Sequence, residues 1–307
     1  MEKHINKSVN LKQMAIEMLK ENHITYDCIG NKVYYGMDSF TIPIMIEDTI
    51  FFFKFFVDAY ENDINAEIKI VEYIKSQNIT IVPKYFSKEN KKVFKSQKYN
   101  MVFYGTQSID GKTNTQLNRQ IVENIVINIA TIHSKLKQFD MQNIDLRKSY
   151  TSERILKLFI KNNRYNDFKK INSYIEELMS INIEYEKLYP IHADLHIGNF
   201  KIINGKLEGI IDFSNIMEAS FEYDVSKFFQ DIIMKDIIKI DELDDLIHLY
   251  RNTSKMNLNL KCLYVNIAYN ILFRYLYSNE DNNEKILFSV KELIKYANNL
   301  YQIWKGN

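Results

Sequence analysis

The stretch HADLHIGNFKIINGKLEGIIDF at residues 192–213 decides the fold. It carries a carboxylate at Asp194, an amide five positions later at Asn199 and a second carboxylate at Asp212. Asn204-Gly205 lies between two apolar runs, and this dipeptide is a strong signal for a two-residue hairpin turn. The hairpin brings Asp212 back toward the loop, so the three polar side chains are predicted to converge on one point.

Such a cluster suits phosphoryl transfer, which depends on alignment and charge neutralisation. One carboxylate faces the acceptor hydroxyl, while an amide oxygen and another carboxylate hold Mg²⁺ against the phosphates of a nucleotide. The alternative for these residues is an ordinary loop and hairpin with solvated polar side chains. The spacing along the whole stretch favours the functional interpretation.

The quoted stretch resembles the catalytic and metal-binding segment of the aminoglycoside phosphotransferase/choline kinase family, usually written H-G-D-L-H-x-G-N followed by I-D-F/W. That family has a protein-kinase-like fold, in which an N-terminal β-lobe and a helical C-terminal lobe bind ATP. The resemblance implies that Asp194 orients or deprotonates the acceptor hydroxyl, and that Asn199 and Asp212 bind Mg²⁺. It also implies that His192 braces the loop.

Some positions depart from the family pattern. Ala193 and Ser214 stand where the pattern has Gly, so the backbone is expected to differ locally at both places. Of the downstream motif D-P-x-x-D-L-A, only the last Asp is retained, as Asp224. The resemblance implies a structural role for Asp224 in tying the C-terminal lobe together.

An upstream lysine completes the pattern. Lys54 lies inside the aromatic run FFFKFF at residues 51–56, where a lone cation is costly unless an anion accompanies it. Glu67, on a predicted helix, can supply a carboxylate, and an ATP phosphate can supply the rest. The alternatives are a charge that discourages edge-strand aggregation for Lys54 and solvated helix surface for Glu67. The order and spacing of the two residues favour the nucleotide role.

Shorter matches extend the nucleotide site. The sequence SIDG at residues 108–111 resembles the connector between the lobes of the family, which implies that backbone groups of Gln107 and Ile109 meet adenine. Ser39 ends a predicted turn that begins at Gly36, where backbone N–H groups and the Ser39 hydroxyl can serve phosphate. A short hairpin turn is the alternative there.

The pattern along the chain predicts the fold class, α+β, as a bilobal protein-kinase-like fold. Residues 1–106 are expected to form a nucleotide-binding lobe with an antiparallel sheet and one main helix. Residues 107–307 are expected to form a larger helical lobe with the catalytic loop, metal site and acceptor cleft. Helical periodicity covers 9–22, 62–76, 117–138, 152–162, 166–187, 223–250, 258–278 and 283–304, and strands are predicted within 24–57 and around 83–87 and 99–106.

Composition excludes several classes of function. Lys and Arg number 40 and Asp and Glu 39, which leaves a net charge of +1 over 307 residues. This balance gives no global positive field, so a nucleic-acid partner is not expected. The two cysteines form no metal or disulfide motif, and the apolar tracts are interrupted before the ~20 residues of a membrane span. A cytoplasmic protein without a membrane partner is therefore expected.

The expected function is Mg²⁺-dependent transfer of the γ-phosphate of ATP, with GTP also possible, to a hydroxyl of an aminoglycoside-type antibiotic. The acceptor is expected to be small and cationic, and the enzyme a monomer or homodimer. Two alternatives remain open: a kinase of a metabolite alcohol such as choline, homoserine or a thiosugar, and a non-catalytic nucleotide-binding protein. Acidic residues at 241–245 and aromatic residues at 264–277 are candidate acceptor contacts, against plain helix surface and core.

Overall fold

The computed structural model describes residues 11–36, 39–57, 61–113, 116–142, 144, 146–148, 176–178, 180–181, 187–277 and 288–298. The chain forms two compact units, the first from Met1–Gly111 with Glu208–Ile211 and the second from Lys112–Leu207 with Asp212–Asn307. The predicted α+β class is confirmed, because strands dominate the first unit and helices the second. Each unit is described by itself.

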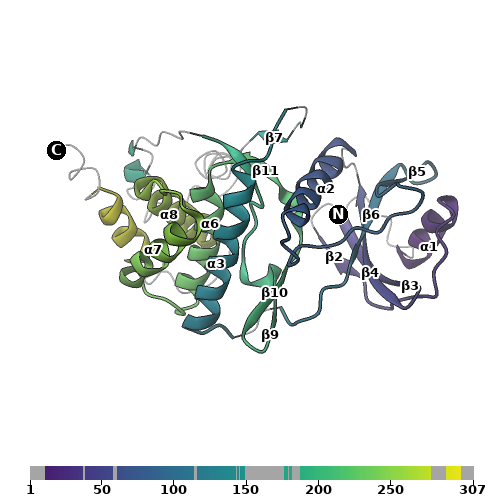
Figure 1. The fold of residues 1–307 in the computed structure, drawn as a ribbon, viewed down its shortest axis with the longest axis horizontal. Helices are drawn as coiled ribbons and strands as arrows, with labels where there is room; N and C mark the ends of the chain where they lie inside the picture. Colours follow the sequence, from purple (N-terminus) through teal and green to yellow (C-terminus); the bar gives the residue numbers. More distant parts are fainter. Residues whose placement is uncertain are drawn as a thin grey trace. The chain divides into compact units, whose positions relative to one another are not determined.

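The first unit is built on an antiparallel six-stranded sheet (Figure 1). Its strands follow the order β1-β3-β4-β6-β5, and β2 pairs with β3 beside β1. The strands are β1 (Cys28–Ile29), β2 (Tyr34–Tyr35), β3 (Ser39–Ile46), β4 (Thr49–Val57), β5 (Phe94–Ser96) and β6 (Met101–Gln107), and the helices are α1 (Leu11–Glu21) and α2 (Glu61–Ser76).

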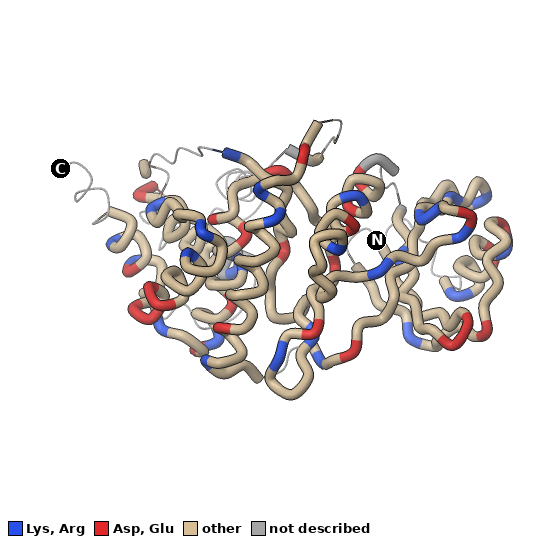
Figure 2. Tube along the Cα trace, viewed as in Figure 1, with Lys and Arg blue, Asp and Glu red and all other residues tan. Residues whose placement is uncertain are grey.

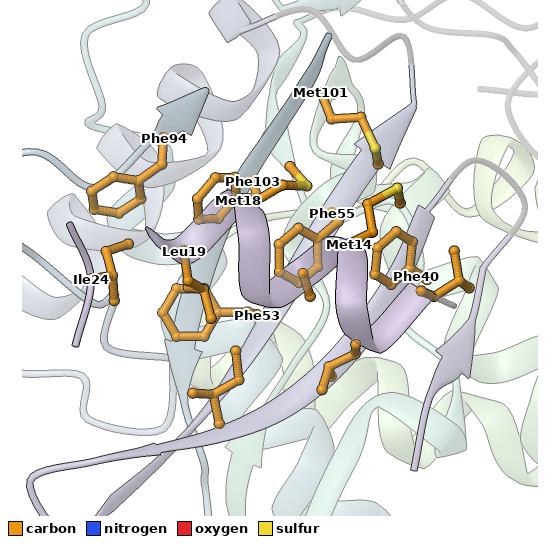
Figure 3. Packing of buried hydrophobic residues seen from close by; sticks show 14 residues of the cluster. Met14, Met18, Leu19, Ile24, Phe40, Phe53, Phe55, Phe94, Met101 and Phe103 are labelled. Carbon is orange, nitrogen blue, oxygen red and sulfur yellow. The ribbon is translucent and has the colours of Figure 1, made fainter. Parts of the chain in front are cut away.

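One face of this sheet is the core of the first unit. Because side chains alternate along a strand, β4 sends Phe53 and Phe55 to this face, and both are fully buried. Figure 3 shows Met14, Met18 and Leu19 of α1 lying over these rings. A fully buried side chain of this size contributes about 1.5–3 kcal/mol, so α1 holds the sheet by its apolar stripe.

Lys54 therefore belongs to the opposite face of the sheet. It pairs with Thr41 of β3 and with Tyr104 of β6, and directly opposed residues share a face. Ser39 lies on this face as well, since it pairs with Phe56, two residues along β4 from Lys54. The alternation of the aromatic run thus separates one cation from the apolar core.

The strand predicted around 83–87 is wrong. Tyr85 forms only an isolated bridge with Thr106, and β5 at Phe94–Ser96 supplies the strand beside β6. Pro83 has no N–H to donate to a ladder. The chain then turns back through Glu89 and Asn90, both with positive φ. The segment that starts at Tyr85 is therefore too short to form a second residue pair with β6.

The second unit is mainly helical. Helix α6 packs on α8, and α3 packs on α7. No helix of the described residues is long and apolar enough to cross a membrane. The helices are α3 (Arg119–Leu136), α6 (Phe221–Met234), α7 (Leu243–Ser254) and α8 (Leu260–Tyr277), the 3-10 turns are η2 (Ile197–Asn199), η3 (Phe213–Asn215) and η4 (Ile240–Glu242), and a small sheet joins β7 (Arg147–Lys148), β11 (Met217–Ala219) and β8 (Tyr189–Ile191).

The prediction of one helix over 223–250 is wrong, because α6 ends at Met234 and α7 begins at Leu243. Asp236 adopts φ 55°, a left-handed conformation in which a short polar residue ends a helix. The predicted helix at 152–162 lies outside the described residues, as does most of 166–187. Residues 288–298 are helical, within the range predicted as 283–304.

The predicted hairpin is confirmed as β9 (Phe200–Ile203) and β10 (Lys206–Ile210). Its turn residues Asn204 and Gly205 have φ values of 49° and 77°. Positive φ at both central positions is the type I′ turn that matches the twist of a hairpin. Asp212 follows β10 after one residue, so the turn fixes where this carboxylate leaves the sheet.

Candidate active site

In the first unit, a buried carboxylate lies on the sheet face that carries Lys54. Glu67 of α2 is 4% exposed. Its Oε1 accepts hydrogen bonds from the hydroxyls of Tyr85 at 2.7 Å and Tyr104 at 2.9 Å, and its Oε2 accepts from Tyr104 at 3.1 Å. Because Tyr104 lies directly opposite Lys54 in the β4–β6 ladder, Glu67 and Lys54 are brought to one face. The Nζ of Lys54 also lies 5.4 Å from the ring centre of Phe56.

The two tyrosines were not found by sequence reasoning. Both are buried, and their rings meet edge to face with centroids 5.6 Å apart. Burial, together with the charge of Glu67, holds the pKa of the Tyr85 hydroxyl well above its usual range, so the group stays a donor. The signal in the sequence was a tyrosine within or beside a predicted strand. Such tyrosines are too common to identify a partner for Glu67.

The remaining nucleotide-site candidates are placed as follows. Ser39 is buried, and a Cβ added to Gly36 would lie 2.7 Å from the Ser39 Oγ, so the hydroxyl needs a glycine beside it. The N–H of Gln107 donates to the carbonyl of Lys84 at 2.7 Å, so this N–H is engaged within the unit. Ile109 packs on Gly209, where an added Cβ would lie 2.6 Å from its Cγ2.

In the second unit, the structure brings Asp194 and Asn199 together. Asn199 is buried, and its Nδ2 donates to the Asp194 carbonyl at 2.9 Å and to the Asp194 Oδ2 at 3.3 Å. Asn215 of η3 donates to the same Oδ2 at 3.3 Å. The Asp194 side chain is 35% exposed. Two amides therefore orient a carboxylate that solvent, or a substrate, can still reach.

The two histidines of the loop brace its backbone. Each accepts a hydrogen bond from the backbone N–H two residues further along the chain. His192 is buried, and its Nδ1 accepts from the N–H of Asp194 at 3.2 Å. The Nδ1 of His196 accepts from the N–H of Gly198 at 3.0 Å. A neutral ring then carries its proton on Nε2, and for His196 this atom lies 3.8 Å from the Asp194 Oδ2.

Asp224 fixes the start of the loop. It is 1% exposed on α6, and its oxygens accept from the N–H of His192 at 3.0 Å and of Ala193 at 2.8 Å. Ala193 has φ 64°, a left-handed conformation that costs a non-glycine residue about 1–2 kcal/mol. The hydrogen bonds that the two N–H groups donate to this buried carboxylate are charge-assisted, and they offset that strain. Ala193, which stands where the family pattern has Gly, is thus held in a strained conformation by Asp224.

A buried network carries this support into the helices. The Nε2 of His133, on α3, lies 3.1 Å from Asp224, and its Nδ1 lies 2.8 Å from the hydroxyl of Tyr250 on α7. If Nε2 donates to the carboxylate, Nδ1 accepts from Tyr250. Burial also raises the pKa of the Tyr250 hydroxyl well above its usual range. His133 is therefore a packed helix residue, and Tyr250 is a partner that sequence reasoning missed.

Asp212 occupies a second strained position. Its φ and ψ are 62° and 64°, and it is exposed. The hydroxyl of Ser214, which stands where the family pattern has Gly, donates to the Asp212 Oδ1 at 2.7 Å. Ser214 and Asn215 are neighbours in η3, so one turn contacts both Asp212 and Asp194. Sequence reasoning noted Ser214 only as a departure and missed Asn215.

The oxygen donors of this unit suit a hard divalent cation. Among the described residues, no group of three or more His, Cys, Asp and Glu side chains could hold a metal. Mg²⁺ needs only one or two carboxylates when substrate phosphates and water complete its octahedron. Because the Nδ2 of Asn199 is used by Asp194, its amide oxygen is the atom left for a metal. The amide oxygen of Asn199 and the carboxylate of Asp212 are therefore donor types that suit Mg²⁺.

The acidic residues at 241–245 are engaged within the unit. Arg119 reaches Asp245 at 3.3 Å and Glu242 at 3.8 Å, and the hydroxyl of Tyr264 donates to Asp244 at 2.9 Å. Tyr264 and Tyr269 of α8 are buried. Helix contacts and core packing therefore account for these three acids and two tyrosines, and the side chains of Phe273, Tyr275 and Tyr277 lie outside the described ones. In the described part of the chain, basic and acidic residues are interspersed over both units (Figure 2).

A kinase-like fold with a braced Asp-and-Asn loop and a following Asp defines the class of the protein, a phosphotransferase. The profile of the phosphotransferase enzyme family (APH) matches residues 46–251. That range is more than half of the chain, and the chain belongs to this family. The predicted enzyme class, with an alcohol group as acceptor, is confirmed at the level of the family.

Individual relatives are distant. Amicoumacin kinase of Bacillus subtilis (strain 168) is 26% identical over 116 residues, which span 37% of this chain but only 34% of that relative. A solved amicoumacin kinase, hAmiN, in complex with AMP-PNP, Ca²⁺ and Ami superposes with a TM-score of 0.69 at 15% identity, covering 93% of this chain and 92% of that one.

Two further solved structures have the same fold. Spectinomycin phosphotransferase APH(9)-Ia, in complex with ADP and its antibiotic, matches with a TM-score of 0.63 at 16% identity, covering 95% of this chain and 98% of that one. A microcompartment-associated aminopropanol kinase matches with a TM-score of 0.61 at 14% identity, covering 92% and 94%. At these identities the likeness shows the fold alone. It confirms the predicted protein-kinase-like fold, but it does not identify the acceptor.

Proposed function

We propose that the protein transfers the γ-phosphate of ATP to a hydroxyl of a small molecule, with Asp194 as the catalytic residue. The observation that carries this proposal is the Asp194 carboxylate, which is oriented by Asn199 and Asn215 and still reachable from solvent. A carboxylate in that state can accept the hydrogen bond of an incoming hydroxyl and then its proton. Positioning on a braced loop supplies the alignment that the reaction needs.

The other candidates take the remaining roles in the proposed reaction. Lys54, on the sheet face shared with Glu67, would bind nucleotide phosphate, with the Ser39 hydroxyl and the connector at Gln107 and Ile109 completing the nucleotide site. In this proposal residues 1–106 form the nucleotide-binding lobe, and residues 107–307 form the lobe with the catalytic loop, the metal site and the acceptor cleft, which begins with the connector. GTP is a possible second donor. AMP-PNP and ADP in the complexes of two structural relatives support a purine nucleotide.

Asn199 and Asp212 would hold Mg²⁺ through an amide and a carboxylate oxygen, while Ser214 orients the carboxylate. When bound, the ion supplies positive charge against the nucleotide phosphates. The loop itself contributes orientation through His192 and Asp224, which fix the backbone on either side of Ala193.

For the acceptor, we propose a cationic antibiotic of the aminoglycoside type, and hence a role in antibiotic resistance. Relatives named for amicoumacin and spectinomycin support an antibiotic. The aminopropanol kinase among the structural relatives favours a second candidate, a metabolite amino alcohol. Cys28 and Cys262 are not joined in a disulfide bond, which is consistent with the proposed cytoplasmic location.

The test is ATP turnover with Mg²⁺ over aminoglycosides, spectinomycin, amicoumacin, choline, homoserine and aminopropanol. Asp194→Asn should lower kcat by about 10²- to 10⁴-fold while nucleotide affinity changes little. The control is Asp140→Asn, an exposed loop carboxylate that caps the N–H of Gln142, and it should keep full turnover. Nucleotide binding without phosphorylation of any acceptor would support the non-catalytic alternative, and full turnover by Asp194→Asn would contradict the assignment.

A further inference from the structure

A second buried carboxylate of α6 holds the far end of the catalytic loop. Asp231 is 3% exposed, and its Oδ2 accepts a hydrogen bond from the backbone N–H of Ile197 at 2.8 Å. Its Oδ1 accepts from the Nη1 of Arg274, on α8, also at 2.8 Å. Lys235 approaches within 3.8 Å. The Asp231 carboxylate thus joins the catalytic loop to α8 through Arg274.

The spacing on α6 explains why two carboxylates serve one loop. Asp224 and Asp231 are seven residues apart, which is about two turns of helix and a rise of about 10 Å, so they lie on one face. Asp224 accepts from the N–H groups of His192 and Ala193, and Asp231 accepts from that of Ile197. The loop is therefore stretched along α6 between two anionic anchors.

Asp231 acts on Asn199 through the backbone. Ile197 begins the 3-10 turn η2, and Asn199 ends it two residues later. The Nδ2 of Asn199 is bonded to Asp194, so a shift of the η2 backbone would move the amide oxygen proposed for the metal and the support of the proposed catalytic carboxylate together. The hold on Ile197 fixes both.

We propose that Asp231, with its charge balanced by Arg274, is a positioning residue for the metal-binding end of the catalytic loop. This inference rests on the proposed function, and it gives α8 a part in the active site through Arg274. A buried carboxylate needs a partner, because removing the cation leaves an uncompensated charge. Arg274→Met alone should therefore destabilise the protein more than Asp231→Asn combined with Arg274→Met.

The test measures AMP-PNP affinity with and without Mg²⁺, beside kcat, for the full chain. Asp231→Ala should weaken the Mg²⁺-dependent part of AMP-PNP binding and lower kcat, each by about tenfold or more, as loss of a residue that orients a metal ligand does. Metal-free AMP-PNP affinity should stay within about twofold. Asp231→Asn keeps an oxygen for the Ile197 N–H and should recover most of the loss.

The matched control is Glu222→Gln. Glu222 is also on α6, and it accepts a backbone N–H, from Asn259, at 2.8 Å, but it does not contact the loop. This variant should keep the Mg²⁺ dependence of the wild type. If Asp231→Ala lowers only the melting temperature, or if it weakens metal-free and Mg²⁺-dependent binding equally, Asp231 is merely structural and the proposal is overturned.

The outcomes also separate this proposal from the proposed function. A wild-type protein that binds AMP-PNP more tightly with Mg²⁺ but phosphorylates no acceptor would refute the transferase, and Asp231 would still be judged by Mg²⁺-dependent binding. A wild-type protein that binds AMP-PNP equally with and without Mg²⁺ would remove the metal site and, with it, the role of Asp231.

Discussion

The clamp on Glu67, made by the hydroxyls of Tyr85 and Tyr104, should be needed for nucleotide binding. Replacing both tyrosines by Phe keeps the buried rings but removes both hydroxyl donors to a carboxylate that is 4% exposed. A hydrogen bond to a charged group contributes about 1.5–3 kcal/mol. Each single variant should therefore lose about 1.5 kcal/mol of stability, because one tyrosine remains, and the double variant should lose more than the sum.

The consequence for function follows from the position of Glu67. Without the two hydroxyl donors, the Glu67 carboxylate is expected to shift toward water and to carry α2 with it. Glu67 then no longer keeps its place on the sheet face that carries Lys54. We expect the double variant to bind ATP about tenfold more weakly, a free-energy loss of about 1.4 kcal/mol. Isothermal titration with AMP-PNP measures the affinity, and steady-state kinetics should show a raised KM for ATP with an unchanged KM for the acceptor.

A matched control exists in the same unit. The hydroxyl of Tyr99 donates to Glu17 of α1 at 2.5 Å, which is a tyrosine–carboxylate pair away from the Lys54 face. Tyr99→Phe should lower stability without changing ATP affinity. If the double clamp variant is destabilised but binds AMP-PNP within about twofold of the wild type, the clamp is structural and the reasoning is refuted.

Three further predictions concern single positions. Ala193→Gly should raise the free energy of unfolding by about 0.5 kcal/mol, because relief of about 1–2 kcal/mol of left-handed strain exceeds the added unfolded-state entropy of about 0.4–1 kcal/mol. Urea unfolding measures the difference, and a less stable variant would contradict the strain. Ser214→Ala should weaken Mg²⁺ activation about tenfold, because Asp212 loses an orienting donor; metal titration with unchanged metal-free nucleotide binding is the check. Above pH 10, unfolded tyrosines lose protons that buried Tyr85 and Tyr250 retain, so stability should fall as pH rises, and less steeply in Tyr85→Phe.

The alkaline effect has a definite sign. The folded pKa of both tyrosines is raised, so their contribution is fully present below the ordinary pKa of 10.0. It is lost as the pH rises beyond that value, because the unfolded state then binds fewer protons than the folded state. Denaturant titrations at pH 9 and pH 11 measure the difference, and equal stability at the two values would contradict the burial argument.

Local pattern determined a large part of this protein. The Asn204-Gly205 turn is predictable because positive φ at both positions is nearly a property of the dipeptide. The alternation of the aromatic run separates Lys54 from the core because side chains of a strand alternate. The spacing of Asp194 and Asn199 brought the two side chains together, since a tight loop spans five residues. The roles assigned to them remain proposals.

Only the tertiary structure decided which distant groups support those residues. Tyr85 and Tyr104 meet Glu67 because a bridge beside β6 and the register of β4 with β6 bring three separate segments together. Asp231 and Arg274 reach the loop because α6 and α8 pack side by side. Such contacts join residues tens of positions apart in the sequence. A buried polar group is stable only with a hydrogen-bond or charge partner, so its role depends on which distant residue packs beside it. A single sequence specifies the local backbone by periodicity and turn residues, but long-range packing decides which hydrogen bonds close.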